Sequence, residues 1–125
     1  MLPDWPDGTV AVLSTSGPHA IPVSTAVRSG DMTIQLALAH TRDSLARLRD
    51  DPRCALTVIA ADTAFTAYAT ATVAREDERV AYVRLDVHEI QDHLQPTFAI
   101  EAGVSWRWTD DDAKAADAKI RAELG

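Results

Sequence analysis

The stretch from Ala39 to Arg49 holds the residues of this sequence that are best suited to chemistry. An alternating strand pattern ends at Ala39 and a short helix pattern follows, so free backbone N–H groups of a helix start are expected here. The same stretch supplies two hydroxyls and two guanidinium groups, from Thr41, Ser44, Arg42 and Arg47. Together these donors can bind an anion such as a phosphate. An ordinary capped helix with a solvated arginine face is the alternative, and composition alone favours it.

The segment from His88 to His93 has the look of the helical zinc motif, in which two histidines four residues apart share one face. Here the two histidines are five residues apart. On a helix this spacing turns the second side chain about 140° away from the first. We therefore expect no metal at this segment, but a solvated polar face with a weak pair between His88 and Asp92.

Other motifs of enzymes and nucleotide-binding proteins are missing from the sequence. There is no G-x-S-x-G elbow for a serine nucleophile, and Ser14, Ser16 and Ser24 have no local signature. Neither a P-loop nor a G-x-G-x-x-G turn occurs. Two interpretations of Trp106 and Trp108 stay open, because either can be a core residue and one can be the wall of a site for a planar ligand.

Length and charge narrow the function classes. A chain of 125 residues is expected to form one domain over residues 1–125. Its net charge of −7 argues against nucleic-acid binding, which needs a basic face. No signal peptide and no apolar run of about 18 residues occurs, so we expect a cytoplasmic protein without membrane association. The lone Cys54 lies in an apolar run and is expected to be a buried, inert thiol.

Period-two alternation predicts six short strands. Thr9–Ser14 ends at a Gly-Pro turn and Ala20–Val27 alternates after it, so the two are expected to form a hairpin. Met32–Ala39 would continue this hairpin into an antiparallel meander. The remaining strands are expected at Ala55–Ala60, Phe65–Val73 and Phe98–Trp108.

Three helices are predicted between and after these strands. Arg42–Asp51 would be capped by Thr41 and ended by Pro52. Glu76–Leu94 repeats apolar residues at spacings of 3 and 4, which is typical of an amphipathic helix. A last helix would be capped by Thr109, with Asp112 three residues on, and would carry the stripe Ala113, Ala116, Ile120 and Leu124. The expected fold class is mainly β, a six-stranded antiparallel barrel with three helices, because closure removes exposed sheet edges.

Several segments within roughly the first seventy residues carry a family resemblance. An apolar strand precedes SGPHAIPVSTAV, with its Pro-Val step. The next segment, GDMTIQLALAHTRDSLARLRDDPRCALTVIA, contains an acidic turn and a helix that ends in Leu-x-x-Asp-Pro-Arg, and AFTAYATATVARE follows it. In order and spacing these segments resemble the pyridoxamine 5'-phosphate oxidase-like superfamily, which includes flavin and deazaflavin oxidoreductases.

The resemblance implies a split β-barrel whose dimer is formed by side-by-side packing and whose cofactor lies in a groove between the subunits. It implies that Pro22, Val23 and Ser24 flank the isoalloxazine-like ring. It makes Trp106 a candidate contribution from the second subunit. It also implies that six residues lie near the phosphate tail: Ala39, His40, Thr41, Arg42, Ser44 and Arg47. No acid–base residue can be assigned.

One region departs from the pattern of the family. Counting back from the step between Asp51 and Pro52, Ser44 stands where many relatives have a phosphate-binding lysine, and Arg47 stands at the usual asparagine. Arg47 could compensate, since guanidinium suits phosphate geometry. The expected function is an oxidoreductase that uses FMN or a deazaflavin at a homodimer interface and acts on a small molecule. The alternative is a non-enzymatic flavin, haem or tetrapyrrole binding protein of the same fold.

Overall fold

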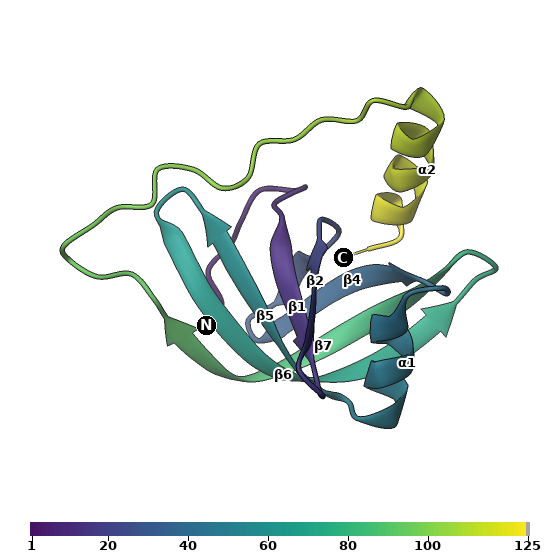
Figure 1. The fold of residues 1–125 in the computed structure, drawn as a ribbon, viewed down its shortest axis with the longest axis horizontal. Coiled ribbons are helices and arrows are strands. Elements are labelled where there is room, and N and C mark those ends of the chain that lie inside the picture. The colour runs from purple at the N-terminus through teal and green to yellow at the C-terminus, as the bar shows by residue number, and fades with distance from the viewer. Residues whose placement is uncertain (125) are drawn as a thin grey trace.

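The computed structural model describes residues 1–124, which form one antiparallel sheet of seven strands and two helices (Figure 1). The strand order across the sheet is β2-β1-β5-β6-β7-β4-β3. The elements are β1 Ala11–Thr15, β2 His19–Val23, β3 Val27–Gly30, β4 Thr33–Ala39, α1 Asp43–Asp50, β5 Arg53–Ala60, β6 Thr63–Glu76, β7 Val80–Asp92 and α2 Asp111–Ala122.

The sheet curls round on itself because its two edge strands are neighbours in the sequence. β2 and β3 lie at opposite edges, yet only residues 24–26 connect them. Thr25, in this connection, uses its hydroxyl to accept from Ala37 N at 3.1 Å and to donate to Ala37 O at 3.2 Å. The Thr25 hydroxyl thus takes the place of a backbone pair with β4, and it extends the β3–β4 pairing into the connection.

Alternation along the strands builds the core inside the curl. Leu13, Ile34, Leu36, Leu56 and Leu85 are fully buried, and each has neighbours in its strand that face outward. Helix α1 packs against β1, β2 and β4 through Leu45 and Leu48. The core therefore follows from period-two alternation in the strands and from one apolar stripe on α1.

The first residues of the chain also belong to the core. Trp5 is 7% exposed, stacks at a tilt on Phe65 with 5.8 Å between ring centroids, and donates its indole N–H to Ala26 O at 2.9 Å. Leu2 is buried beside it and donates its backbone N–H to Asp31 O. Two apolar side chains thus anchor a leader in which the sequence pattern predicts no element.

Most of the predicted early elements are confirmed. β1 and β2 form the expected hairpin, and strands are present near the predicted positions of β4, β5 and β6. The predicted strand Ala20–Val27 is instead two strands, β2 and β3, because the chain crosses from one sheet edge to the other within it. The predicted meander is therefore wrong: β4 pairs with β3 and β7, and not with the second strand.

The predicted helix Glu76–Leu94 is wrong. These residues contain the end of β6, a turn and the strand β7, which pairs with β4 on one side and β6 on the other. The four residues from Val80 to Val83 are all buried, because both faces of the sheet are covered at this point. A strand buried on both faces loses its strict alternation of apolar and polar residues. Here the apolar residues have the 3 and 4 spacing of a helix, which produced the wrong prediction.

The predicted strand Phe98–Trp108 is also wrong, although its alternation is the longest in the chain. This segment has no regular secondary structure and no ladder partner, and residues 101–110 are all exposed. A strand needs a neighbour for its backbone groups, and residues 1–124 of a single chain offer none here.

Both helix caps differ from the predicted ones. Arg42, without a side-chain cap bond, takes the N-cap position of α1 in place of Thr41. Asp110 caps α2 in place of Thr109 by accepting from the N–H groups of Asp112 and Ala113. Within residues 1–124 there is no helix that combines the length and apolar character needed to cross a membrane.

Candidate functional site

A cleft of about 340 Å³ opens where the β2–β3 connection, the end of β4 and the C-terminal helix meet. Its walls are mainly apolar or small side chains, with one cation and one carboxylate. The lining residues are Pro22, Val23, Ser24, Thr25, Ala37, Leu38, Ala39, Arg42, Val80, Trp108, Asp117 and Ile120. A cleft of this size and character is typical of small-molecule sites.

Local sequence explains why the chain leaves space at this position. Residues 24–26 carry no ladder bonds of their own, and the hydroxyl of Thr25 holds this connection against Ala37. The end of β4 supplies only Ala37, Leu38 and Ala39, whose side chains are short or turned inward. Because the side chains from the β2–β3 connection and from β4 are small, they leave the space between these two segments unfilled.

Five of the ten residues predicted for a cofactor site line this cleft together: Pro22, Val23, Ser24, Ala39 and Arg42. They come from two parts of the sequence, the end of β2 and the β4–α1 connection. Arg42 provides the guanidinium group of the lining and lies directly before the first turn of α1. The cleft thus joins an apolar wall to an anion-binding side chain.

Two other predicted phosphate contacts are used inside the protein. Ser44 is fully buried, and its Oγ lies 3.0 Å from Nε2 of His19. Arg47 donates to the Asp43 carboxylate at 3.0 Å and to the carbonyl of Ser16 at 3.0 Å. Gly17 permits this approach, because its φ is +81° and a Cβ there would lie 2.9 Å from the Arg47 guanidinium. These groups brace the β1–β2 turn against α1.

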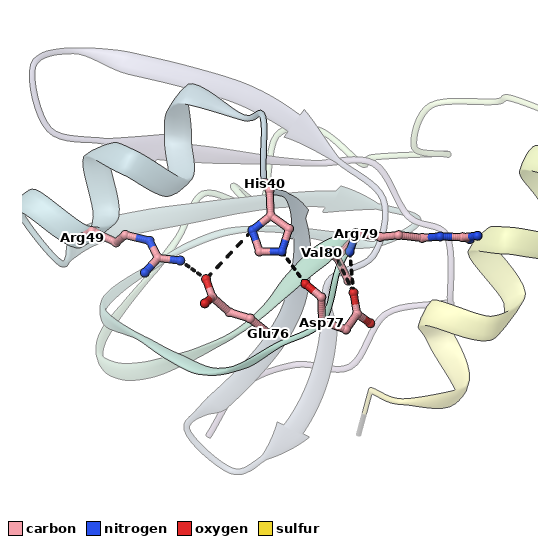
Figure 2. Close-up of polar contacts among 6 residues, drawn as sticks. All are labelled: His40, Arg49, Glu76, Asp77, Arg79 and Val80. Carbon is pink, nitrogen blue, oxygen red and sulfur yellow. Dashed lines mark hydrogen bonds and ion pairs between the residues drawn. The ribbon is translucent and has the colours of Figure 1, made fainter.

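His40 connects the anion-binding end of the cleft to the β6–β7 turn (Figure 2). Its Nε2 must carry the proton, because the partner is the carbonyl oxygen of Asp77 and a carbonyl can only accept. Its Nδ1 lies 4.0 Å from Glu76, and Glu76 also forms an ion pair with Arg49 of α1. The backbone N–H of His40 donates to Arg79 O at 3.3 Å. Thr41, the next residue, is exposed.

The turn that receives His40 has hydrogen bonds of its own. The Asp77 carboxylate accepts from the backbone N–H groups of Val80 at 2.9 Å and Arg79 at 2.8 Å. These bonds hold the pKa of Asp77 below its usual value, because they stabilise the charged form. The hydrogen bonds of His40 therefore attach the β4–α1 connection, which contains Arg42, to this turn.

The two tryptophans of the C-terminal segment take different positions. Trp106 is 41% exposed and donates its indole N–H to Gly8 O at 2.8 Å, outside the cleft. Trp108 lines the cleft and meets Trp106 edge to face, with 5.2 Å between ring centroids. Of the two, it is therefore Trp108 whose ring faces the lining shared with Pro22 and Arg42.

Sequence reasoning missed the wall that α2 supplies, which consists of Asp117 and Ile120. Ile120 lies on the predicted apolar stripe, so its inward position had a signal. Asp117 had no such signal, because only the folded chain brings α2 to the same cleft as the β2–β3 connection. Cys54 lies apart from the cleft in β5, and burial raises the pKa of its thiol to about 12.

The chain is similar in fold to known proteins, although its sequence is far from theirs. No protein-family profile and no curated protein matches the chain. Solved structures do match. A candidate pyridoxamine 5'-phosphate oxidase from Listeria innocua is 12% identical with a TM-score of 0.56, over 68% of this chain and 88% of its own.

Two further structures are similar over most of their length. HupZ of Group A Streptococcus is 13% identical with a TM-score of 0.58, over 78% of this chain and 90% of its own. An FMN-binding protein from Syntrophomonas wolfei is 13% identical with a TM-score of 0.50, over 72% of this chain and 79% of its own.

The fold and the cleft define the class first: a small, mainly β protein whose curled antiparallel sheet carries a ligand-sized cleft at its seam. The structural matches then show what this fold is similar to. The chain shares its fold with the solved structures that it matches, among them candidate pyridoxamine 5'-phosphate oxidases. The expected mainly β, antiparallel fold is confirmed, while residues 1–124 form seven strands and two helices where six and three were predicted.

Proposed function

We propose that this protein is an oxidoreductase that binds FMN or a deazaflavin in the cleft between the β2–β3 connection, β4 and α2. The observation that carries the proposal is the lining itself, in which apolar residues of β2 and β4 stand beside the guanidinium group of Arg42. A flavin has the same division, with a flat apolar ring and an anionic tail. The similar fold of an FMN-binding protein supports the same cofactor class.

The chain's own residues would bind and orient this cofactor. A bound flavin or deazaflavin supplies hydride transfer, and a flavin also supplies electron transfer. Pro22 and Val23 would pack on the ring, and Arg42 would pair with the phosphate. Thr41, exposed next to Arg42, could add a hydroxyl donor. Ser44 and Arg47 would act indirectly, by holding α1 and the β1–β2 turn in place.

A homodimer is part of the proposal, and the outer face of β2, β1, β5 and β6 supports it. The strand registers place eight outward, solvent-accessible residues next to one another, and none of them is charged: Val12, Ser14, Ala20, Pro22, Ala55, Thr57, Ile59 and Tyr68. The charges lie at its border, at Arg53 of β5 and at Glu89 of β7, which pairs with Tyr68. Two chains of net charge −7 repel each other least where such a neutral face meets a copy of itself.

The neutral face also touches the cleft, because Pro22 belongs to both. A second subunit on this face would therefore lie beside the bound cofactor. Chain mass in solution tests this point by light scattering. A mass of two chains that falls to one chain in Ile59→Arg is the expected result, and a wild-type monomer contradicts the dimer.

Flavin fluorescence tests the cofactor. Titration of FMN with the protein should quench its fluorescence, and Arg42→Ala should weaken binding about tenfold or more, since a hydrogen bond from a charged group is lost. Riboflavin, which lacks the phosphate, should bind both forms equally. Arg107→Ala, a change of an exposed arginine outside the cleft, is the matched control. A parallel titration with a deazaflavin separates the two cofactors, and failure of both to bind contradicts the proposal.

The donor set of the cleft favours a flavin over haem in the alternative, non-enzymatic function. Haem needs an axial ligand, usually a histidine, and none of the residues that line the cleft within residues 1–124 is a histidine. His19, His40 and His93 are bonded to Ser44, Asp77 and Thr66. A Soret band on reconstitution that one His→Ala change abolishes would reverse this preference.

A further inference from the structure

The C-terminal helix α2 is attached to the barrel with little burial of its side chains. None of its residues is buried, although α1 and every strand except β3 contribute buried side chains to the core. Its apolar stripe of Ala113, Ala116 and Ile120 is only half-buried. Figure 1 shows α2 standing away from the sheet at its start, with its last turn nearer to the sheet. Burial of apolar surface therefore contributes little to holding α2.

The segment that leads to α2, residues 93–110, is also held by few contacts, and we call it the tether. Residues 93–110 contain no helix or strand, and they run outside the sheet (Figure 1). Two long-range hydrogen bonds fix the middle of this tether, from Asp62 N to Ile100 O at 2.9 Å and from Trp106 Nε1 to Gly8 O at 2.8 Å. Gly103 passes so close to β5 that a Cβ there would lie 2.7 Å from Ile59 O. Between Trp106 and Arg121, no hydrogen bond joins the described chain to the sheet.

What holds α2 in place is polar and sits at the cleft. Arg121 donates to the carbonyl of Ser24 at 2.6 Å, and Asp117 holds the same guanidinium group at 2.6 Å. A second tie joins Glu123 to Arg75 at 2.9 Å, but both of these side chains are about half exposed, so it contributes little. Arg121 is thus the main latch between α2 and the cleft.

The latched position is an imperfect one. Nη1 of Arg121 is buried without a hydrogen-bond partner among residues 1–124. A buried donor without a partner destabilises the arrangement that contains it. Opening would return this nitrogen to water, and it would free the carbonyl of Ser24.

From these contacts we infer that α2 is a hinged cover of the cleft, latched by Arg121 to Ser24, and that a ligand enters and leaves when this latch opens. Ser24 is a cleft residue, and Trp108, Asp117 and Ile120 form the movable wall opposite it. The inference rests on the proposed function, because it makes the position of α2 the control on access to the proposed cofactor site. Arg121 is a positioning residue in this scheme.

The test compares two full-length variants that each remove one cation from α2. Arg121→Ala removes the latch, while Lys114→Ala removes an exposed lysine whose side chain has no polar partner within residues 1–124. Stopped-flow quenching of FMN fluorescence should show association and dissociation rates raised about fivefold in Arg121→Ala, and wild-type rates in Lys114→Ala. Equal rates in all three proteins would overturn the inference.

Amide hydrogen exchange gives a second measurement that does not depend on FMN. Exchange over residues 111–122 should be faster in Arg121→Ala than in Lys114→Ala, with β5, β6 and β7 unchanged. If FMN binds none of the proteins, the proposed cofactor is wrong, and exchange alone decides the inference. Faster exchange then supports a cover over a site for another ligand, and unchanged exchange overturns it.

Discussion

The sheet body, residues 11–92, and the C-terminal segment, residues 93–124, use the same apolar residue types to opposite effect. In the body, alternating side chains such as Leu36 and Leu56 are fully buried. In the segment, Val104 is 65% exposed and Phe98 is 48% exposed, although they alternate just as regularly. The difference shows that alternation makes a strand only where a neighbouring strand completes the ladder.

Truncation of one side chain in each region should give the largest contrast. Leu85→Ala leaves a cavity at a fully buried site and should lower the free energy of unfolding by about 2–5 kcal/mol. Val104→Ala, in the exposed segment, should change it by less than about 0.5 kcal/mol. Urea denaturation followed by circular dichroism measures both. A comparable loss from Val104→Ala would mean that the segment is packed in solution.

Thr25→Val tests the connection between β2 and β3 in the sheet body. The variant keeps the shape of the side chain but loses both hydrogen bonds to Ala37, so we expect a loss of about 1–3 kcal/mol. FMN should also bind more weakly, because Thr25 lines the cleft. Thr72→Val, an exposed threonine of β6, is the control and should be nearly neutral. Equal stability of the two variants would show that the Thr25 hydroxyl does not stabilise the contact between the β2–β3 connection and β4.

Asp110→Ala tests the C-terminal segment through the N-cap of α2. Loss of the N-cap bonds to Asp112 and Ala113 should destabilise α2 by about 1 kcal/mol. Because α2 buries no residue, amide exchange in α2 should become faster while global unfolding in urea stays the same. Asp110→Asn should restore slow exchange, since asparagine caps equally well. A shift of the global transition would show that α2 unfolds together with the sheet.

The smallest expected effect concerns acid stability of the β6–β7 turn. The pKa of Asp77 is lower in the folded protein than in the unfolded chain, because backbone N–H groups bind its charged form. Its stabilising contribution is therefore complete above about pH 5, declines as the pH falls through the unfolded pKa, and is lost below the folded pKa. Asp77→Asn should flatten the decline of stability between about pH 5 and pH 3. An unchanged pH profile would contradict this assignment.

Sequence patterns predicted the elements whose partners lie close in the chain. The hairpin of β1 and β2 and the helix with Leu45 and Leu48 depend on local alternation and spacing, so they were found. β7 was misassigned because it is buried on both faces, and its central position between β4 and β6 depends on pairings far apart in the sequence. Periodicity carries no information about such neighbours.

The candidate site was predictable to a similar extent. Pro22 and Arg42 were singled out by resemblance to a family, and the fold brings both to one cleft. Asp117 could not be found in this way, because a polar residue on an exposed helix has no pattern that distinguishes it. Ser44 and Arg47 had the right chemistry for an anion, but tertiary contacts with His19 and the β1–β2 turn already use them.

The buried leader has a consequence for how the chain completes its fold during synthesis. Trp5 is made well before its aromatic partner Phe65, which is added only after β5 has been made. The carbonyl of Ala26, which accepts from the Trp5 indole, is available earlier, but the ring contact has to wait until β6 begins to emerge. Packing of Trp5 on Phe65 is therefore a late step when this chain folds during synthesis.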